Sequence, residues 1–315
     1  MAFISVVSGC LNEGANVEEL YRRIRAVFDK ELPDDSFELI FIDNASTDDT
    51  ETYLRKLAAE DYRVKVIFNT RNFGHIRPGV HAMYQAQGDA IIGMASDLED
   101  PPELISEFVR RWRAGYRIVL GQKESSEESR LFFRVRKIYY SLLNKLSEIT
   151  LIENATGFGL YDRKVVNEVK KIDDPYPYFR GLLCEIGYPI SLVQYRKPQR
   201  KRGFSKNNFY TLWDMAMLGI TSFSKLPLRL ATFLGLASAL VSLFVGAFYL
   251  MYKLAFWNDF QLGTAPLAIG VFFLGSVQLI FLGVLGEYVG AVYTQVAKRP
   301  LVIERDRINF QIRHE

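Results

Sequence analysis

FELIFIDNASTDDTETYLRKLAAE, residues 37–60, carries the clearest signature of the fold. It begins with an apolar run of strand length, residues 37–43, and ends in an amphipathic segment, residues 49–60. Between the two lies a turn rich in carboxylate, amide and hydroxyl side chains. A strand, a polar turn and a helix in this order form the repeating unit of an α/β sheet.

Residues 1 to about 224 repeat this pattern, because short apolar runs alternate with amphipathic stretches. The strand-like runs are residues 4–8, 37–43, 64–69, 89–94 and 117–121, and the helix-like segments include residues 16–28 and 49–60. The alternation predicts a mostly parallel sheet covered by helices.

Polar side chains follow four of the strand-like runs. These residues are Asn12 and Glu13, Asp43 and Asn44, Asn69, and Asp97 and Glu99. Ligands of parallel α/β sheets bind at the carboxyl ends of the strands. We therefore expect a polar ligand at this edge of the sheet, with carboxylates suited to a divalent cation.

Composition excludes several other classes of protein. The chain has 315 residues and 49% hydrophobic content, which is ample for a sizeable core. A net charge of +3 does not argue for nucleic acid as a partner, so any basic site must be local. Cys10 and Cys184 lie far apart without further ligands at metal spacing, so neither a disulfide framework nor a zinc site is expected.

Two stretches near the C-terminus lack charged residues, from Leu230 to Tyr252 and from Phe260 to Gly286. Each reaches the length of about 20 residues that a membrane-spanning helix needs. We predict spans at about 229–252 and 265–287. Two buried helices of a soluble core are the alternative, but such helices rarely lack charge over this length.

Basic residues flank both predicted spans on the same side, and the N-terminus lacks the basic region of a signal peptide. The soluble part is therefore expected to be cytoplasmic and the protein to be multi-pass in the inner (plasma) membrane. The predicted organisation is a cytoplasmic domain at 1–206, an interfacial helix at 207–225, two spans within 226–298 and a cytoplasmic tail at 299–315.

Five motifs occur in order over residues 1 to about 210. They are N-E at 12–13, D-N-A-S-T-D-D-T at 43–50, N-T-R-N-F-G at 69–74, D-L-E-D-P-P-E-L at 97–104 and R-K-P-Q-R-K-R-G-F-S-K at 196–206. This set resembles family 2 glycosyltransferases of the polyprenyl-phosphate type, which include dolichol-phosphate mannose synthase and the bacterial bactoprenol glucosyltransferases. The bacterial group also has two C-terminal transmembrane helices.

The resemblance implies a GT-A fold and an inverting transfer of a hexose from a nucleotide sugar to polyprenyl (undecaprenyl) phosphate, with Mg²⁺ or Mn²⁺ as cofactor. UDP-glucose is the expected donor, with GDP-mannose or an amino-sugar donor as the alternative. The resemblance also leaves room for a homo-oligomer and a separate flippase. Two other readings are a processive polysaccharide synthase, for which Arg111-Trp112 is a weak sign, and a catalytically silent membrane-anchored protein that binds nucleotide sugars.

The acidic motif after the fourth strand is expected to face the donor diphosphate. Asp97 and Glu99 are the predicted metal ligands, and Asp97 is the predicted catalytic residue. Asp100 is expected to cap a helix that starts at the two prolines, with Glu103 at the third helical position. Ala95 stands where relatives commonly have a further Asp. The predicted donor-binding residues are Asn12, Glu13, Asp43, Asn44 and Asp97, whereas Asp48 is expected to cap a helix.

The acceptor phosphate requires cations. Its predicted ligands are Lys123, Arg134, Arg200, Arg202, Ser205 and Lys206. A polybasic patch for anionic lipid is the rival interpretation of the basic segment. An interfacial helix is expected at about 131–147. Gly157 replaces an Asp that has been proposed as a base in relatives, but a phosphate monoester is largely a dianion at neutral pH and needs little help from a base.

Overall fold

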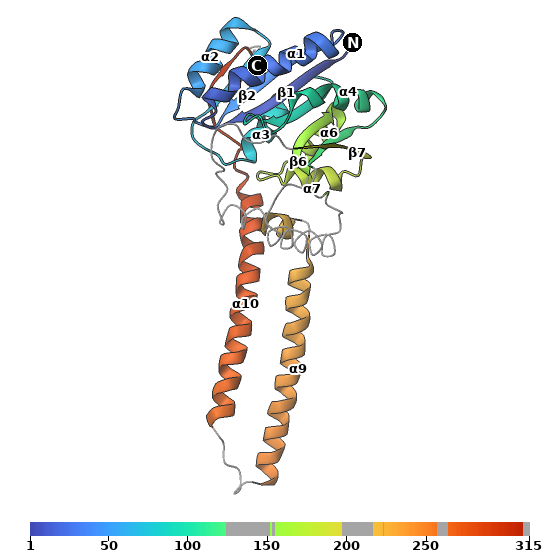
Figure 1. Cartoon of the computed structure of the whole chain (residues 1–315). Coiled ribbons are helices and arrows are strands. Elements are labelled where there is room, and N and C mark those ends of the chain that lie inside the picture. The colour runs from blue at the N-terminus through green and yellow to red at the C-terminus, as the bar shows by residue number, and fades with distance from the viewer. Residues whose placement is uncertain (124–151, 153–154, 197–216, 223, 257–263, 311–315) are drawn as a thin grey trace.

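The computed structural model describes residues 1–123, 152, 155–196, 217–222, 224–256 and 264–310, which form an α/β domain joined to two long helices (Figure 1). The predicted interfacial helix at 131–147 lies outside the described residues. The same holds for five predicted phosphate ligands, Arg134, Arg200, Arg202, Ser205 and Lys206. Residues 217–222, within the predicted helix at 207–225, are helical.

Eight strands of the described chain form one sheet, in the order β7-β5-β6-β4-β1-β2-β3-β8. Their bounds are β1 Phe3–Cys10, β2 Ser36–Asp43, β3 Val64–Asn69, β4 Ala90–Ala95, β5 Ile118–Lys123, β6 Ala155–Asp162, β7 Ile190–Tyr195 and β8 Glu304–Ile308. β1 pairs in parallel with β2 and β4, β2 with β3, and β5 with β7, whereas β6 and β8 are antiparallel to their neighbours. The predicted strand-like runs coincide with β1 to β5, and the mostly parallel sheet is confirmed.

Helices cover both faces of the sheet. One face carries α1 Gly14–Glu31, α2 Thr50–Glu60 and α4 Ile105–Arg113, and the other carries α3 Arg77–Gln85, α6 Arg163–Ile172 and α7 Phe179–Glu185. Because side chains alternate along a strand, β2 sends Leu39 and Phe41 to the first core and Ile40 and Ile42 to the second. Burial on both faces explains why the central strands are almost continuously apolar.

Two strands of the α/β domain, β6 and β7, are absent from the sequence-based prediction. β6 contains Gly157 and Gly159, and glycine weakens a strand pattern. The packing requires Gly159, because a Cβ there would lie 2.4 Å from the carbonyl oxygen of Val119 on β5. Gly157 has a φ of +92°, a conformation that other residues rarely adopt. The close approach of β6 to its neighbours is therefore a tertiary requirement.

The two long helices are α9 Leu226–Ala255 and α10 Thr264–Ala297. Both are long and apolar enough to cross a membrane, and their apolar windows are not covered by the rest of the described chain. α9 contains the first predicted span. α10 continues past the second predicted span, because no charged residue follows Glu287 before Lys298. Figure 1 shows the two helices side by side, projecting from the same end of the domain.

The prediction of a C-terminal tail at 299–315 was incomplete, since these residues include a strand. β8 pairs antiparallel with β3 at the edge of the sheet, with Val66 opposite Ile308. Its sequence, ERDRI, is rich in charge, which is common on exposed edge strands and hides the strand from apolar pattern searches. The chain leaves the domain through α9 and returns to it after α10 (Figure 1).

The weak sign of a processive synthase has an ordinary structural explanation. Arg111 and Trp112 lie in α4, where Arg111 pairs with Glu107 at 2.6 Å, four residues earlier. The Trp112 indole donates to the carboxylate of Asp162 at 2.9 Å. Arg111 also donates to Ser191 Oγ of β7 at 2.9 Å, so both residues hold α4 on the sheet.

Candidate functional site

The loops that follow β1, β2 and β4 begin side by side at the carboxyl edge of the sheet. Cys10 at the end of β1 is in register with Asp43, and Gly9 with Ala95. The sheet therefore places the predicted donor residues and the predicted metal ligands on one edge, in loops that start from adjacent strands.

Asn12 joins the first two of these loops. Its backbone N–H donates to the Ser46 hydroxyl at 2.8 Å, and its side-chain oxygen accepts from the Thr47 N–H at 2.8 Å. Its φ of 55° lies in the left-handed region, which Asn tolerates better than most residues. Asn12 thus shapes the wall of the candidate site, and direct contact with the donor stays a prediction.

Asp43 is buried, with 2% of its surface exposed, at the end of β2. Its carboxylate accepts hydrogen bonds from the backbone N–H and the hydroxyl of Ser46. Burial raises the pKa of Asp43, and the two Ser46 donors oppose this effect. The hydrogen-bond donors of the Asp43 carboxylate thus come from the loop that follows β2.

Asn44 holds the loop that follows β3. Its amide nitrogen donates to Asn72 Oδ1 and to the Gly74 carbonyl, both at 2.8 Å. Its amide oxygen accepts from the Phe73 N–H at 2.9 Å and from Asn69 Nδ2 at 3.2 Å. These four bonds use both donors and both lone pairs of the amide. The prediction that Asn44 binds the donor directly is untested, and its observed partners are all internal.

Glu13 and Asp48 connect the starts of α1 and α2. Glu13 occupies the N-cap position of α1, and its N–H donates to Thr50 Oγ1 at 2.9 Å. The Asp48 carboxylate accepts from the N–H of Thr50 at 3.1 Å and of Gly14 at 3.3 Å, although the N-cap of α2 is Asp49. Burial would raise the pKa of Asp48, but these hydrogen bonds outweigh it and lower the pKa. The Asp48 side chain therefore caps α2 from the residue before the N-cap, and it also holds the start of α1.

Asp97 and Glu99 lie on one tight turn after β4. Asp97 Oδ1 accepts from the Glu99 N–H at 3.1 Å, and Leu98 between them has a φ of 62°. Both acidic residues are partly exposed. Two carboxylates on one accessible turn fit a hard cation that keeps water or substrate oxygens as its other ligands. In the described part of the chain, no group of three or more His, Cys, Asp or Glu residues is arranged to enclose a metal.

Ser96 anchors this turn to β1. Its hydroxyl lies 2.7 Å from Ser8 Oγ and 3.0 Å from Cys10 Sγ, and it donates to the Gly9 carbonyl at 3.0 Å. Burial raises the pKa of the Cys10 thiol, which is therefore protonated at neutral pH. Cys10 and Cys184 are both free, as predicted.

The prediction that Asp100 caps a helix was wrong. The short 3₁₀ helix Pro102–Leu104 has Pro101 at its N-cap, with no side-chain cap. The Asp100 carboxylate points inward instead. It accepts from the Ala95 N–H at 3.1 Å and from the Tyr195 hydroxyl at 2.9 Å, with only 5% of the residue exposed. The Asp100 carboxylate, bonded to the last residue of β4, is thus unavailable to the helix.

The expected partner of Asp100 in the cap, Glu103, also has a different role. It pairs with Arg23 on α1 at 2.6 Å. Burial raises the pKa of Asp100, while the Ala95 N–H, the charge of Lys123 and the Tyr195 hydroxyl act in the opposite direction.

Lys123, the one predicted phosphate ligand within the described residues, ends β5 beside this carboxylate. It is in register with Tyr195 at the end of β7. The structure thus places a cation on the same edge as the acidic turn. The sequence analysis did not predict Tyr195, because it did not predict β7. The signal that could have found Tyr195 is its position directly before the basic motif at 196–206.

Gly157 lies on β6 beside β4. If Gly93 of β4 carried a Cβ atom, that atom would lie 3.3 Å from the Gly157 carbonyl oxygen. That carbonyl accepts a hydrogen bond from the Tyr161 hydroxyl at 2.7 Å. With no side chain at this position, Gly157 contributes no carboxylate to the site.

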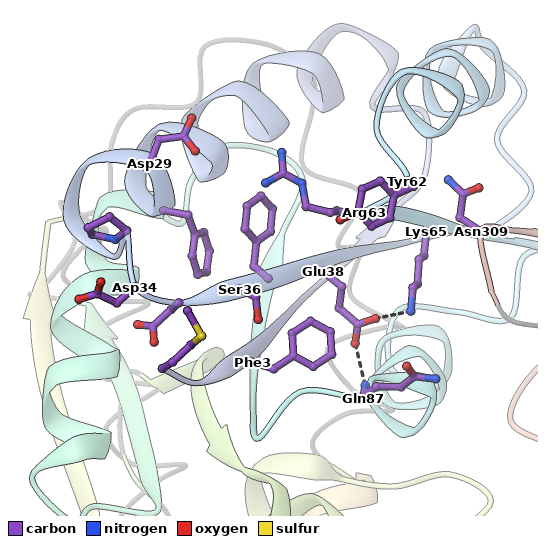
Figure 2. Close-up of a pocket in the computed structure, with 15 residues that line it drawn as sticks. Phe3, Asp29, Asp34, Ser36, Glu38, Tyr62, Arg63, Lys65, Gln87 and Asn309 are labelled. Atoms are coloured by element: carbon purple, nitrogen blue, oxygen red, sulfur yellow. Dashed lines mark hydrogen bonds and ion pairs between the residues drawn. The ribbon is translucent and has the colours of Figure 1, made fainter.

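A hollow of the described chain lies away from this edge. It has a volume of ≈780 Å³ and lies at the amino ends of β1 and β2, lined by Phe3, Ser36, Glu38 and Lys65 among others (Figure 2). Glu38 is buried there, 2.6 Å from the ammonium group of Lys65, and accepts from the Gln87 N–H at 2.7 Å. None of the predicted site residues lines this hollow.

Residues 5–170 match the profile of Glycosyl transferase family 2. The chain belongs to this family. This family 2 glycosyltransferase is 37% identical over 302 residues to the SfII prophage-derived bactoprenol glucosyl transferase of Shigella flexneri, which covers 95% of this chain and 96% of that protein. It is 36% identical to the prophage bactoprenol glucosyl transferase homolog of Escherichia coli K12, with coverages of 95% and 97%. The predicted family is therefore confirmed.

Among solved structures, the glycosyltransferase is similar to glucosyl-3-phosphoglycerate synthase from Mycobacterium tuberculosis. The TM-score is 0.47 and the sequence identity 21%, over 70% of this chain and 78% of that one.

Proposed function

We propose that this family 2 glycosyltransferase moves a hexose, glucose as first choice, from a UDP-sugar to polyprenyl phosphate at a membrane surface. The observation that carries the proposal is the Asp97–Glu99 turn, which starts from the same edge of the sheet as the loops after β1 and β2, in a chain that also has two uncovered apolar helices. The full-length similarity to proteins named bactoprenol glucosyl transferase supports the choice of sugar and lipid. GDP-mannose or an amino-sugar donor is the alternative within the same reaction.

Asp97 and Glu99 are the residues that would hold Mg²⁺ or Mn²⁺. A divalent cation at this position acts as a Lewis acid for a leaving diphosphate. Two carboxylates leave coordination positions for water and for substrate oxygens, in keeping with the preference of these cations for mixed oxygen ligands. Ser96 holds the turn on β1, so the carboxylates are fixed relative to the loops that would bind the nucleotide.

Glu13 and Asp43 are the proposed ligands of the nucleotide, since carboxylates suit ribose hydroxyls and base edges. Asn12 and Asn44 support them from behind, because their amide groups tie together the loops after β1, β2 and β3.

The proposed reaction needs no general base from the protein. An oxygen of the acceptor phosphate attacks the anomeric carbon, the bond from that carbon to the diphosphate breaks, and UDP leaves on the opposite face with inversion. The acceptor is mostly a dianion at neutral pH, so a carboxylate at Gly157 is dispensable. The protein must instead hold two anions in line, and Lys123 and the basic residues 196–206 are the proposed cations for the acceptor.

The proposed location is the inner (plasma) membrane, with α9 and α10 as its two spans and the catalytic domain on the cytoplasmic side. Basic residues at both flanks and the return of the chain to β8 support this orientation. A homo-oligomer and a flippase partner stay predictions from the resemblance.

The deciding experiment uses the purified full chain, Mn²⁺ or Mg²⁺, polyprenyl phosphate and a panel of labelled nucleotide sugars. We expect a lipid-linked hexose from UDP-glucose, dependent on the metal. Product from GDP-mannose or an amino-sugar nucleotide alone would correct the donor. Donor binding without lipid-linked product from any donor would overturn the proposal in favour of a silent nucleotide-sugar binding protein.

A further inference from the structure

We infer that Asp100 and Tyr195 are positioning residues that set the spacing between the acidic turn at 97–99 and the cationic end of the sheet at Lys123. That the acidic turn faces the donor and Lys123 faces the acceptor rests on the proposed function. The link itself rests on the contacts of the described residues.

The Asp100 carboxylate is the bridging group. One oxygen accepts from the N–H of Ala95 at the end of β4, and the other accepts from the hydroxyl of Tyr195 at the end of β7. β5 and β6 separate these strands in the sheet, so the bridge joins strands about 14 Å apart at the usual interstrand spacing. Asp100 and Tyr195 are each only 5% exposed. Solvent therefore competes little for either hydrogen bond.

The aromatic ring of Tyr195 is itself held in place. It packs edge-on against Phe158 of β6, with 5.6 Å between ring centroids and an interplanar angle of 81°. Phe158 in turn contacts Phe108 of α4, with 4.9 Å between centroids. The hydroxyl therefore meets Asp100 from a fixed direction, and a change at the hydroxyl need not disturb the ring.

Lys123 ties this bridge to the cationic side. Its place opposite Tyr195 in the β5–β7 register puts it at the same end of the sheet, and its positive charge acts on the Asp100 carboxylate. After Tyr195 the sequence continues into the basic segment 196–206. A shift of the Tyr195 backbone would therefore move both the register partner Lys123 and the start of that segment.

The acidic turn lies between two independent anchors. Ser96 binds β1 on one side, and Asp100 binds β4 and β7 on the other, while Asp97 and Glu99 between them are partly exposed. Loss of the Tyr195 bond leaves the Ser96 anchor and the Ala95 bond intact. Substitution of Tyr195 should therefore affect the Lys123 side of the site and leave the metal-binding turn at 97–99 largely unaffected.

Tyr195→Phe in the full chain is the test, because the ring stays and only the hydroxyl is lost. We expect the KM for polyprenyl phosphate to rise about tenfold, the size of effect for one hydrogen bond to a charged group. The Mn²⁺ concentration for half-maximal activity and the dissociation constant for the nucleotide sugar should stay within twofold of the wild type. Asp100→Asn should raise both the acceptor KM and the Mn²⁺ requirement, because one amide oxygen cannot replace two carboxylate oxygens.

Tyr21→Phe is the matched control. Tyr21 donates the same kind of hydrogen bond to a carboxylate, Asp61, at 2.8 Å, but lies on α1 away from the site. Tyr21→Phe should lower the melting temperature about as much as Tyr195→Phe. It should leave the KM for polyprenyl phosphate and the Mn²⁺ concentration for half-maximal activity unchanged. An unchanged acceptor KM in Tyr195→Phe, or the same KM change in Tyr21→Phe, would overturn the inference.

Amide hydrogen exchange separates this inference from the proposed function. Tyr195→Phe should speed exchange at the amides of residues 95–100 at least threefold, and Tyr21→Phe should not, whatever the substrate is. If exchange is faster in Tyr195→Phe but the wild-type protein makes no lipid-linked sugar, only the proposed function is refuted. Unchanged exchange in Tyr195→Phe would refute the bridge even if the transferase reaction is confirmed.

Discussion

Asp97 and Asp100 show how two carboxylates three residues apart acquire different roles. Asp97 is partly exposed on a turn beside Glu99, whereas Asp100 is buried and bonded to Ala95 and Tyr195. Partial exposure of the first is consistent with its proposed role as a metal ligand. Burial commits the second to the protein, since a buried carboxylate must have its hydrogen bonds satisfied inside.

Asp97→Asn should abolish most metal-dependent turnover. The amide can still accept from the Glu99 N–H, so the turn should persist while the negative charge is lost. We expect kcat/KM to fall by a factor of about 100 or more, in line with the several kcal/mol that a Lewis-acid metal contributes. Turnover across a Mn²⁺ titration is the measurement. Asp34→Asn, at an exposed Asp beside the hollow at the opposite edge, is the control and should behave as wild type. Full activity in Asp97→Asn would contradict the metal assignment.

Asp61 should contribute to stability in a pH-dependent way. Burial would raise its pKa, but hydrogen bonds from Arg63 and Tyr21 lower it to about 2 from an ordinary value of 3.8. A pKa depressed in the folded state adds stability that is present above the unfolded pKa near 4 and is lost as pH falls through about 2. After allowance for solvent screening, the contribution is about 1 kcal/mol.

Thermal unfolding of Asp61→Asn at several pH values checks this expectation. The variant should have a lower melting temperature than the wild type at pH 6, and the difference should shrink as the pH approaches 2. Exposed Asp34→Asn again provides the comparison. A difference that stays constant between pH 6 and pH 2 would show that the Asp61 carboxylate does not carry the effect.

β8 is the element that ties the C-terminal end of the chain to the domain. Glu304 lies 2.6 Å from His81, Arg305 pairs with Glu51 at 2.6 Å, and Asp306 pairs with Arg55 at 2.8 Å. The two arginine ion pairs are largely exposed, so each is worth little. The stronger tie comes just after the strand, where the Asn309 side chain donates to the carbonyls of Ala58 at 2.7 Å and Val64 at 2.8 Å.

Asn309→Ala should therefore destabilise the domain more than Arg305→Gln. The first removes two hydrogen bonds to backbone carbonyls and places Ala at a φ of 61°, for an expected loss of about 2 kcal/mol. The second removes an exposed ion pair and should cost about 0.5 kcal/mol. Urea unfolding of both variants, with the release of the C-terminal residues followed by limited proteolysis, measures the difference. Equal losses would mean that β8 is held by its charges.

At the level of the whole molecule, the return of β8 to β3 places both ends of the helical hairpin next to the same domain (Figure 1). Two helices that cross a membrane and begin and end at one domain must have their connection on the opposite side. The sheet contact and the charge of the flanks both support the proposed two-span topology.

Cysteine accessibility in intact cells tests this arrangement. In a Cys184→Ser background, Asp259→Cys in the connection between α9 and α10 should react with a membrane-impermeant maleimide. Tyr62→Cys, at a domain residue that is 81% exposed, should react only after permeabilisation. Labelling of both residues from outside, or of neither, would contradict the two-span topology.

Local patterns in the chain were enough to predict β1 to β5, the helices at 16–28 and 49–60 and the two apolar helices. Periodicity and hydropathy act over neighbouring residues, so they are readable without the fold. The edge that gathers Asn12, Asp43 and Asp97 was also predictable, because parallel strands direct their following loops to one edge.

Long-range packing settled the rest. In β6, Gly159 is needed because β5 approaches closely, and Gly157 because of its positive φ. β8 is charged, as is common for an edge strand, and neither strand has the apolar pattern of a buried strand. Asp100 resembles a helix cap in its local sequence, yet its carboxylate binds Tyr195, 95 residues away. A neighbour brought near by the sheet outweighed the local preference, since a buried carboxylate is stabilised by whichever donors surround it in space.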